Sequence, residues 1–313
     1  MKILIYGAGV IGSIYAAKLF AEKNDVTLLA RGKHLESLEQ YGVIIREQLS
    51  GKKMTARIPL RQELEKNDFY DLIIVTVRLE QVESELPFLK NNSASSLIMF
   101  MLNNPGGIKE IADQLKPKQV IFGFPGVGGT RKGDEINFIQ IKQQKTTIAE
   151  LTSRKSPTIK KIKSLLEKAG FEIAISDNIE AWLETHPVFI SCISAAIVNE
   201  NGNSIQLGKN KKSIQLMVKS IKEGFKALQN LGIRIRPLNL KIIFLIMPEW
   251  FSVLYWQKAM QSEMGTLAIA PHAMAAKSEM QLLAEKVLEI VHSSSKSAPS
   301  LDLLLSDFIN SGE

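Results

Sequence analysis

The sequence predicts an α/β protein: an N-terminal Rossmann domain with a doubly wound parallel sheet, followed by an all-helical C-terminal domain. Three observations lead to this fold class. Five continuous apolar runs lie before Pro125, as in parallel strands that are buried on both faces. A glycine-rich segment follows the first run. After Asn178 nearly every segment has the apolar spacing of a helix.

The first half alternates strands with helices. The predicted strands are Ile3–Tyr6, Asp25–Arg31, Asp71–Val77, Ser96–Leu102 and Gln119–Phe124. Helical spacing lies between them, first in Val10–Ala21 and later from Gly107 onward. Gly126–Leu151 then begins with an irregular loop, and two β runs follow the loop, which we expect to form a hairpin at the edge of the sheet.

The second half changes to helical spacing. Ser156–Gly170 has a Ser-Pro start and a glycine stop, and Phe171–Asp177 is a last short strand. The predicted helices that follow are Ile179–Val198, with Pro187 as a kink or a second start, Lys211–Leu231, Leu238–Gln261, Ala275–His292 and Leu301–Ile309. We place the domain boundary so that residues 1–165 form the Rossmann domain and residues 166–313 the helical domain.

The composition is that of an ordinary globular protein. The 313 residues are 45% hydrophobic and 23% charged, with a formal charge of +7. Because the basic residues are scattered, we expect no nucleic-acid partner, and the charge instead suits a phosphorylated or carboxylate ligand. The single cysteine, Cys192, excludes an internal disulfide and fits a buried hydrophobe in a reducing compartment. The start "MKILIYGAG" indicates a strand and not a signal peptide, so a cytoplasmic location is expected.

The longest strongly apolar stretch is Ile242–Trp256. Pro248 and Glu249 interrupt it, and it is too short to span a bilayer. We therefore expect no membrane contact. The stretch fits a core helix or a subunit interface, and the second alternative makes a homodimer an expectation.

The segment "GAGVIGS" fits the G-x-G-x-x-G pattern between a strand and a helix. The first glycine of this pattern allows a tight turn, the second lets the backbone approach a pyrophosphate, and the third lets the helix pack against the strand. The helix N-terminus offers free N–H groups to phosphate oxygens. The expected phosphate-binding residues are Gly7, Ala8, Gly9, Val10, Ile11 and Gly12.

The end of the second strand indicates which dinucleotide binds. An NAD site usually has an acidic residue there, whereas this strand ends in Arg31, with Lys33 close by. An arginine can hold a 2′-phosphate with two charge-assisted hydrogen bonds, so we predict NADP(H) as the cofactor. Arg78, just after the strand Asp71–Val77, is a further cation at this edge of the sheet. The alternative for all three side chains is an exposed loop cation.

The glycine segment, "LLAR", "VTVRLEQV", "MLNNPGG" and a helical half that starts "EAWLETH" together resemble the ketopantoate reductase (2-dehydropantoate 2-reductase) family. The resemblance covers nearly the whole chain. It implies a Rossmann and a helical domain, and hydride transfer from NADPH to the ketone of a 2-oxo acid, a step of pantothenate biosynthesis. It also implies that Asn103 lies near the nicotinamide and the substrate. The alternative is a turn residue in "NNPGG".

The helical half departs from the family pattern. The family's lysine two residues after a tryptophan, which polarises the carbonyl, is Glu184 here, and Val188 and Cys192 replace two asparagines. A carboxylate with an ordinary pKa is ionised at pH 7 and cannot donate a proton. His186 is a candidate for the missing acid, because a histidine titrates near neutral pH. On a regular helix it points about 200° away from Glu184, so the two are not expected to act as a pair.

Three further residues are substrate-binding candidates. Asn201 matches a family asparagine if one residue is deleted, and Ser262 and His272 are nearest by position to the family's remaining polar residues. For each histidine the alternative is a structural role. No metal site is predicted.

Two functions therefore stand as hypotheses. The first is an NADPH-dependent reductase of a 2-oxo acid or a related small carbonyl, whose substrate is a carboxylate. The second is a catalytically impaired NADP-binding protein, such as a sensor or a partner subunit, because Glu184 stands in place of the lysine.

Overall fold

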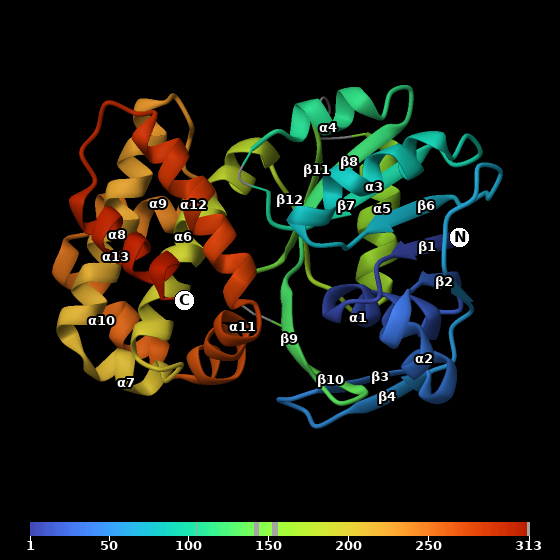
Figure 1. Cartoon of the computed structure of the whole chain (residues 1–313), viewed down its shortest axis with the longest axis horizontal. Helices are drawn as coiled ribbons and strands as arrows, with labels where there is room; N and C mark the ends of the chain where they lie inside the picture. Colours follow the sequence, from blue (N-terminus) through green and yellow to red (C-terminus); the bar gives the residue numbers. More distant parts are fainter. Residues whose placement is uncertain (105, 141–143, 152–155, 312–313) are drawn as a thin grey trace. The chain divides into compact units, whose positions relative to one another are not determined.

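The computed structural model describes residues 1–104, 106–140, 144–151 and 156–311 (Figure 1). The chain divides into two compact units: Met1–Asn103 with Gly107–Ile179, and Asn104–Gly106 with Glu180–Glu313. The boundary that we expected after residue 165 lies inside helix α5 (Pro157–Lys168), which stays in the first unit. The reason is that the strand after α5 still pairs with the sheet of that unit.

An eight-stranded sheet forms the centre of the first unit, in the order β12–β11–β8–β7–β6–β1–β2–β5. Its strands are β1 (Lys2–Tyr6), β2 (Asp25–Leu29), β5 (Leu60–Arg61), β6 (Leu72–Val75), β7 (Leu97–Met101), β8 (Gln119–Phe124), β11 (Thr146–Glu150) and β12 (Ile173–Ile175). Neighbouring strands from β5 to β8 are parallel, and β11 is antiparallel to β8. The predicted doubly wound sheet is confirmed. Its strand order reverses direction between β1 and β6, which is the switch point where ligands bind in such sheets.

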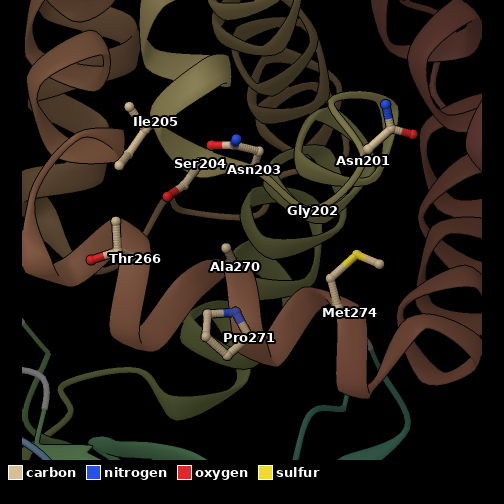
Figure 2. Close-up of a pocket in the computed structure, with 9 residues that line it drawn as sticks. All are labelled: Asn201, Gly202, Asn203, Ser204, Ile205, Thr266, Ala270, Pro271 and Met274. Carbon is tan, nitrogen blue, oxygen red and sulfur yellow. The ribbon is translucent and has the colours of Figure 1, made fainter.

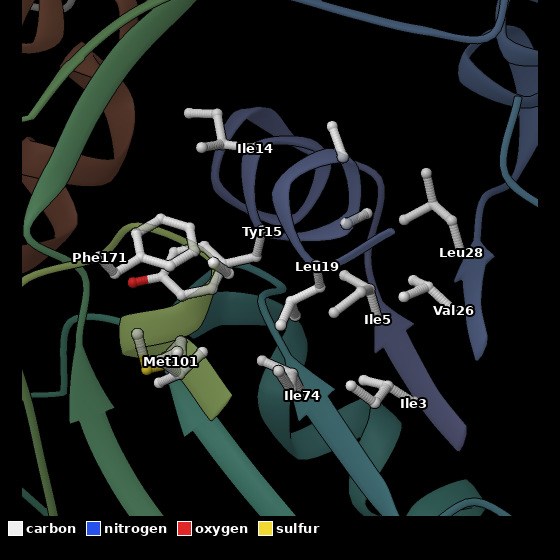
Figure 3. Close-up of a cluster of buried hydrophobic side chains, with 14 of the residues drawn as sticks. Ile3, Ile5, Ile14, Tyr15, Leu19, Val26, Leu28, Ile74, Met101 and Phe171 are labelled. Carbon is white, nitrogen blue, oxygen red and sulfur yellow. The ribbon is translucent and has the colours of Figure 1, made fainter. Parts of the chain in front are cut away.

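Helix α1 (Val10–Ala21) packs on this sheet and fixes the position of its own N-terminus. Ile14, Tyr15 and Leu19 are completely buried, and Leu19 points toward the strand residue Ile5 (Figure 3). The Tyr15 ring stacks on Phe171, with 4.2 Å between ring centroids. The other helices of the unit are α2 (Gly32–Tyr41), α3 (Leu79–Asn91), α4 (Ile108–Gln114) and α5.

A second sheet in the first unit corrects the expected edge hairpin. Strands β9 (Val127–Lys132) and β10 (Glu135–Gln140) do form an antiparallel pair, but β10 also pairs with β3 (Val43–Glu47), which pairs with β4 (Lys53–Ala56). This four-stranded sheet has the order β4–β3–β10–β9. The hairpin leaves the main sheet because Ile136 and Phe138 of β10 join the apolar core that includes α1. The edge of the main sheet is extended by β11 and β12 instead.

The second unit is helical, as predicted. Its elements are α6 (Ile179–Asn199), α7 (Ser204–Lys209), α8 (Lys211–Asn230), α9 (Leu238–Lys241), α10 (Glu249–Met260), α11 (Ala270–Ala275), α12 (Lys277–His292) and α13 (Pro299–Asn310), with π-helical turns η1 (Ile242–Ile246) and η2 (Met264–Ile269). The predicted single helix Leu238–Gln261 is wrong. It is divided into α9, η1 and α10, because Pro248 lacks the N–H that an uninterrupted helix needs.

Helix α6 lies at the centre of this unit and continues through Pro187. It has the length and apolar composition of a membrane span, but 78% of its most apolar window is buried inside the protein, as in a core helix. Its packing is tight against α8 and α13. A methyl group at Gly224 of α8 would lie 2.5 Å from Cγ1 of Val188 and 2.8 Å from Cδ1 of Leu301.

Candidate functional site

The predicted phosphate loop joins β1 to α1 and has the geometry of a cradle. Gly7 has a φ of 119°, which other residues rarely adopt. Gly12 has no room for a side chain, since a Cβ there would lie 1.9 Å from the Gly7 carbonyl oxygen and 2.5 Å from Oγ1 of Thr76. Gly9 is exposed, and a Cβ there would meet no atom within 4 Å. The three glycines therefore serve the turn, the close packing and the open approach that the pattern predicts.

The loop lies at the carboxyl end of β1, next to the switch point. Gly9 is the N-cap of α1 and supplies no side-chain cap, so the first turn, which includes Val10 and Ile11, keeps N–H groups for a ligand. Ala8 is buried behind the loop. These residues fit the pyrophosphate of a dinucleotide, because the open space lies at the positive end of the helix dipole.

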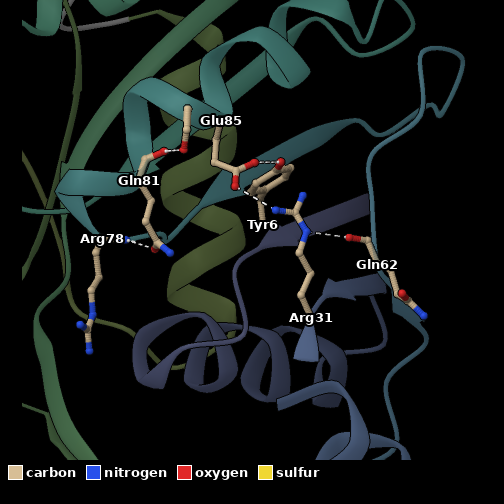
Figure 4. A network of polar contacts seen from close by, with 7 residues as sticks. Tyr6, Arg31, Gln62, Arg78, Gln81 and Glu85 are labelled. Atoms are coloured by element: carbon tan, nitrogen blue, oxygen red, sulfur yellow. Dashed lines mark hydrogen bonds and ion pairs between the residues drawn. The ribbon is translucent and has the colours of Figure 1, made fainter. Parts of the chain in front are cut away.

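Arg31 follows β2 and is held in a network of polar contacts (Figure 4). Its Nη1 lies 2.9 Å from Oε1 of Glu85, and its Nε donates to the carbonyl oxygen of Gln62 at 3.0 Å. The Tyr6 hydroxyl donates to the other oxygen of Glu85. Burial, together with this carboxylate, raises the pKa of Tyr6. The Arg31 side chain is 49% exposed, and these two contacts engage its Nη1 and its Nε.

The other two predicted cations, Lys33 and Arg78, lie outside the Arg31 network. Lys33 is exposed in the first turn of α2. Arg78 is the N-cap of α3, and its guanidinium points away from the Arg31–Glu85 pair (Figure 4). It lies 3.9 Å from Glu80, a contact between exposed groups that contributes little. Both side chains are solvent-accessible cations, so their predicted cofactor roles stay predictions.

Arg131 is a fourth cation at the loop, and the sequence analysis did not predict it. It lies on β9, and its Nη2 donates to the carbonyl oxygen of Ala8 at 2.9 Å. Burial lowers its pKa. Successive side chains of a strand point to opposite faces of the sheet, so the position of Arg131 along β9 determines its face. The sequence does not indicate that the phosphate loop lies on that face.

Asn103 lies just beyond the end of β7 and is buried. The turn that follows uses its neighbour, since Oδ1 of Asn104 accepts the N–H of Gly106 at 3.1 Å. Pro105 of the same motif lies outside the described residues. The turn therefore has its own asparagine, and the role of Asn103 near the nicotinamide stays a prediction.

On α6 the candidate acids have different environments. His186 is 4% exposed and stacks on Trp182 with 5.0 Å between ring centroids. Burial, and to a lesser degree the charge of His272, lowers the pKa of His186 to about 3. The imidazole is therefore neutral at pH 7. Glu184 is partly exposed.

The two positions where the resemblance implies asparagines belong to the core. Val188 is 1% exposed, and Cys192 is completely buried. Burial raises the pKa of the Cys192 thiol, so it is not a nucleophile at neutral pH. Neither side chain can bind a ligand in this packing.

The helical unit contains a cavity of about 370 Å³ between two segments far apart in sequence (Figure 2). Its lining residues are Asn201, Gly202, Asn203, Ser204, Ile205, Thr266, Ala270, Pro271 and Met274. Of the predicted substrate residues, Asn201 lines it. Ser262 is exposed and donates to the carbonyl oxygen of Ala259, and His272 lies between two lining residues without lining the cavity. Burial lowers the pKa of His272.

Apart from Asn201, the residues of this lining were not predicted from the sequence. Asn203 is the N-cap of α7, and Thr266 lies on η2, a π-helical turn of a kind often found at functional sites. Gly202 has a φ of 78°, and Met274 packs where its side chain would be. In the ranges that the structure describes, no three His, Cys, Asp or Glu side chains are placed to hold a metal ion.

The fold and the glycine loop define a class, the Rossmann proteins that bind dinucleotides at a switch point. Residues 3–153 match the family model of ketopantoate reductase PanE/ApbA. The 2-dehydropantoate 2-reductase of Pyrococcus horikoshii is 28% identical over 254 residues, which are 77% of this chain and 79% of that protein. These similarities support the ketopantoate reductase family for this chain.

Solved structures agree on the fold. The ternary structure of D-mandelate dehydrogenase with NADH and anilino(oxo)acetate has a TM-score of 0.79, with 18% identity, and covers 99% of this chain and 98% of that one. A dimeric ketopantoate reductase from Staphylococcus aureus has a TM-score of 0.70, with 14% identity, and covers 99% of both chains. A Rossmann part followed by a helical part is thus shared over nearly the whole length of these chains.

Proposed function

We propose that this protein is an NADP(H)-dependent reductase of a small 2-oxo acid or a related carbonyl. The observation that carries the proposal is the open phosphate loop at the switch point, with Arg31 where an NAD site has an acidic residue. Similarity to this family supplies the reaction class. Mandelate is also a 2-hydroxy acid, so the neighbouring D-mandelate dehydrogenase fits the same class.

The Rossmann unit binds and orients the cofactor in this proposal. The N–H groups at the start of α1 hold the pyrophosphate, and the Nη2 of Arg31 donates to the 2′-phosphate. Glu85 and the Gln62 carbonyl fix the Arg31 side chain in advance, which reduces the entropy lost on binding. Lys33 and Arg78 add positive potential, and Asn103 binds the carboxamide. The bound nicotinamide supplies the hydride.

The helical unit binds the substrate in this proposal. The amide and hydroxyl groups of Asn201, Ser204 and Thr266 can donate hydrogen bonds to a carboxylate, while Ile205 and Met274 offer apolar contacts. We expect a carboxylate with a short apolar substituent. Ser262 and His272 lie outside the cavity lining, so we expect smaller effects from them.

Reduction of the carbonyl also consumes one proton at its oxygen. We assign this proton to Glu184, because His186 is held neutral at pH 7 and a buried neutral imidazole is a weak acid. A carboxyl group serves as the acid only while it is protonated. Glu184→Gln should therefore abolish most of kcat while leaving the NADPH affinity unchanged.

The test is a titration of the purified protein with NADPH and NADH, followed by turnover with ketopantoate, pyruvate, 2-oxoisovalerate and benzoylformate. NADPH-selective binding with turnover of at least one 2-oxo acid supports the proposal. Binding of neither cofactor refutes it.

A catalytically impaired NADP-binding protein is the second candidate. The observations that favour it are the neutral His186 and the burial of Val188 and Cys192, which leave α6 without a cationic acid at these positions. It predicts tight NADPH binding without turnover of any 2-oxo acid. In that case Glu184→Lys should create measurable turnover, whereas Glu184→Gln should not.

We also propose that the protein forms a homodimer through the helical unit. Leu238, Ile242, Ile246, Trp250 and Leu254 are large apolar side chains that remain exposed on α9, η1 and α10, and Trp250 is 68% exposed. Exposed apolar surface of this extent marks interaction sites. Light scattering should give twice the chain mass, and Trp250→Glu should give the monomer. A monomeric parent protein would contradict this proposal.

A further inference from the structure

Arg131 has a geometry that its place in a surface hairpin does not explain. Its guanidinium reaches from β9 of the second sheet to the phosphate loop of the first, where Nη2 donates to the Ala8 carbonyl oxygen at 2.9 Å. The side chain is only partly exposed. Burial of a guanidinium is unfavourable unless an anion compensates it.

Among the described residues, Asp134 acts on Arg131 by its charge, but no carboxylate is paired with the guanidinium. No carboxylate lies within 4.0 Å of Arg131 in the described ranges. Asp134, the acidic group whose charge acts on Arg131, accepts a hydrogen bond from Ser37. The carbonyl oxygen of Ala8 does not need Arg131 as its hydrogen-bond donor, because it also accepts a hydrogen bond from the Ser13 hydroxyl at 3.3 Å.

The field of this cation covers the region where a dinucleotide would lie. The pKa of His34, in the first turn of α2, is lowered mainly by burial and to a smaller degree by the charge of Arg131. Arg131 therefore acts on both the start of α2, next to Arg31, and the loop before α1. A guanidinium has five N–H donors, and the single bond to Ala8 leaves four of them for phosphate oxygens.

We propose that Arg131 binds the pyrophosphate of the dinucleotide together with the N–H groups at the start of α1 and is a further cofactor-binding residue. This rests on the proposed function. The loop supplies neutral N–H donors, and Arg131 supplies the positive charge that the loop itself lacks. Since both NADPH and NADH carry the pyrophosphate, Arg131 contributes to affinity and not to the choice between them.

The experiment measures dissociation constants of NADPH, NADH, ADP and adenosine by calorimetry for the full chain. Arg131→Ala should weaken NADPH, NADH and ADP alike by about 10- to 100-fold, the range for a lost hydrogen bond to a charged group. Adenosine should change by less than about threefold. Lys132→Ala is the matched control, because it removes an equal charge from the next, exposed residue of β9 and should change none of them.

Two conservative variants separate the effect of the Arg131 charge from the effect of its hydrogen bond to the phosphate loop. Arg131→Gln keeps a donor for the Ala8 carbonyl but removes the charge, and it should lose ADP affinity while keeping the melting temperature. Arg131→Lys should retain part of the affinity. If Arg131→Gln binds ADP as the parent does, or if only NADPH is weakened by Arg131→Ala, the inference is overturned.

The measurements also separate this inference from the proposed function. Binding of ADP that depends on Arg131, without binding of either nicotinamide dinucleotide, would refute the reductase and support the pyrophosphate contact. NADPH binding with turnover that is unaffected in Arg131→Ala would do the opposite. A parent protein that binds none of these ligands refutes both.

Discussion

Two glycines of the phosphate loop should respond in opposite ways to the same substitution by alanine. Gly12 lies inside α1, where intrinsic propensity alone would make alanine more stable by about 1 kcal/mol. A Cβ at this position would, however, lie 1.9 Å from the Gly7 carbonyl oxygen, a backbone atom that a rotamer change cannot move. Overpacking of this kind costs about 1–3 kcal/mol, so we expect Gly12→Ala to lower the free energy of unfolding.

Gly9→Ala should leave the fold intact and remove the function. Gly9 has a φ of −70°, which alanine adopts without strain, and its Cβ would meet no atom within 4 Å. Alanine at this position can even raise the free energy of unfolding by about 0.4–1 kcal/mol, because it reduces the conformational entropy of the unfolded chain. The same methyl group would occupy the space through which a pyrophosphate approaches the backbone.

Urea unfolding and NADPH titration of both variants test this reasoning together. We expect a lower unfolding midpoint for Gly12→Ala only, and NADPH affinity reduced by at least about tenfold in Gly9→Ala, which corresponds to 1.4 kcal/mol. Gly9→Ala with unchanged affinity would show that the open space is not the phosphate site. Gly12→Ala with unchanged stability would show that the close approach of α1 to β1 is not required.

Three further predictions concern single side chains. Arg31→Ala should weaken NADPH about 10- to 100-fold and NADH by less than about threefold in paired titrations, and equal effects on both would argue against the 2′-phosphate role. Glu223 accepts from the N–H and hydroxyl of Ser300 and from the N–H of Leu301 at the start of α13, so Glu223→Ala should cost about 1–2 kcal/mol in urea unfolding and Glu223→Gln less. His186 has a pKa of about 3 when folded and about 6.5 when unfolded, so the unfolded chain gains its proton first and stability should fall as the pH decreases from 6.5 toward 3. His186→Phe should flatten that part of the stability profile, and an unchanged slope would contradict the burial argument.

The β1–α1–β2 unit could be predicted from sequence because its signals are local. The three glycines, the four-residue apolar run before them and the helical spacing after them all lie within Ile3–Ala21. The long helices α6 and α8 were predicted within one residue at each end for the same reason. Periodicity over many residues is the most dependable signal that a single sequence contains.

The second sheet could not be predicted in this way. Its strands β3 and β4 are short, and the partner of β3 is β10, more than 80 residues further along the chain. The cavity in the helical unit could not be predicted for the same reason, since Asn203 and Thr266 come from segments about 60 residues apart. Arg131 acts at the loop only because the second sheet brings it there. Contacts over such separations depend on tertiary packing, which local patterns do not encode.

The tight crossing of α6, α8 and α13 has an evolutionary consequence. Gly224 and Leu301 fill the space around Val188, so a polar amide at that position would be buried without a partner, at a cost of about 1–3 kcal/mol. An asparagine at position 188 is therefore accessible to this chain only if α8 and α13 change at the same time. The core thus restricts which polar side chains this part of α6 can acquire by single substitutions.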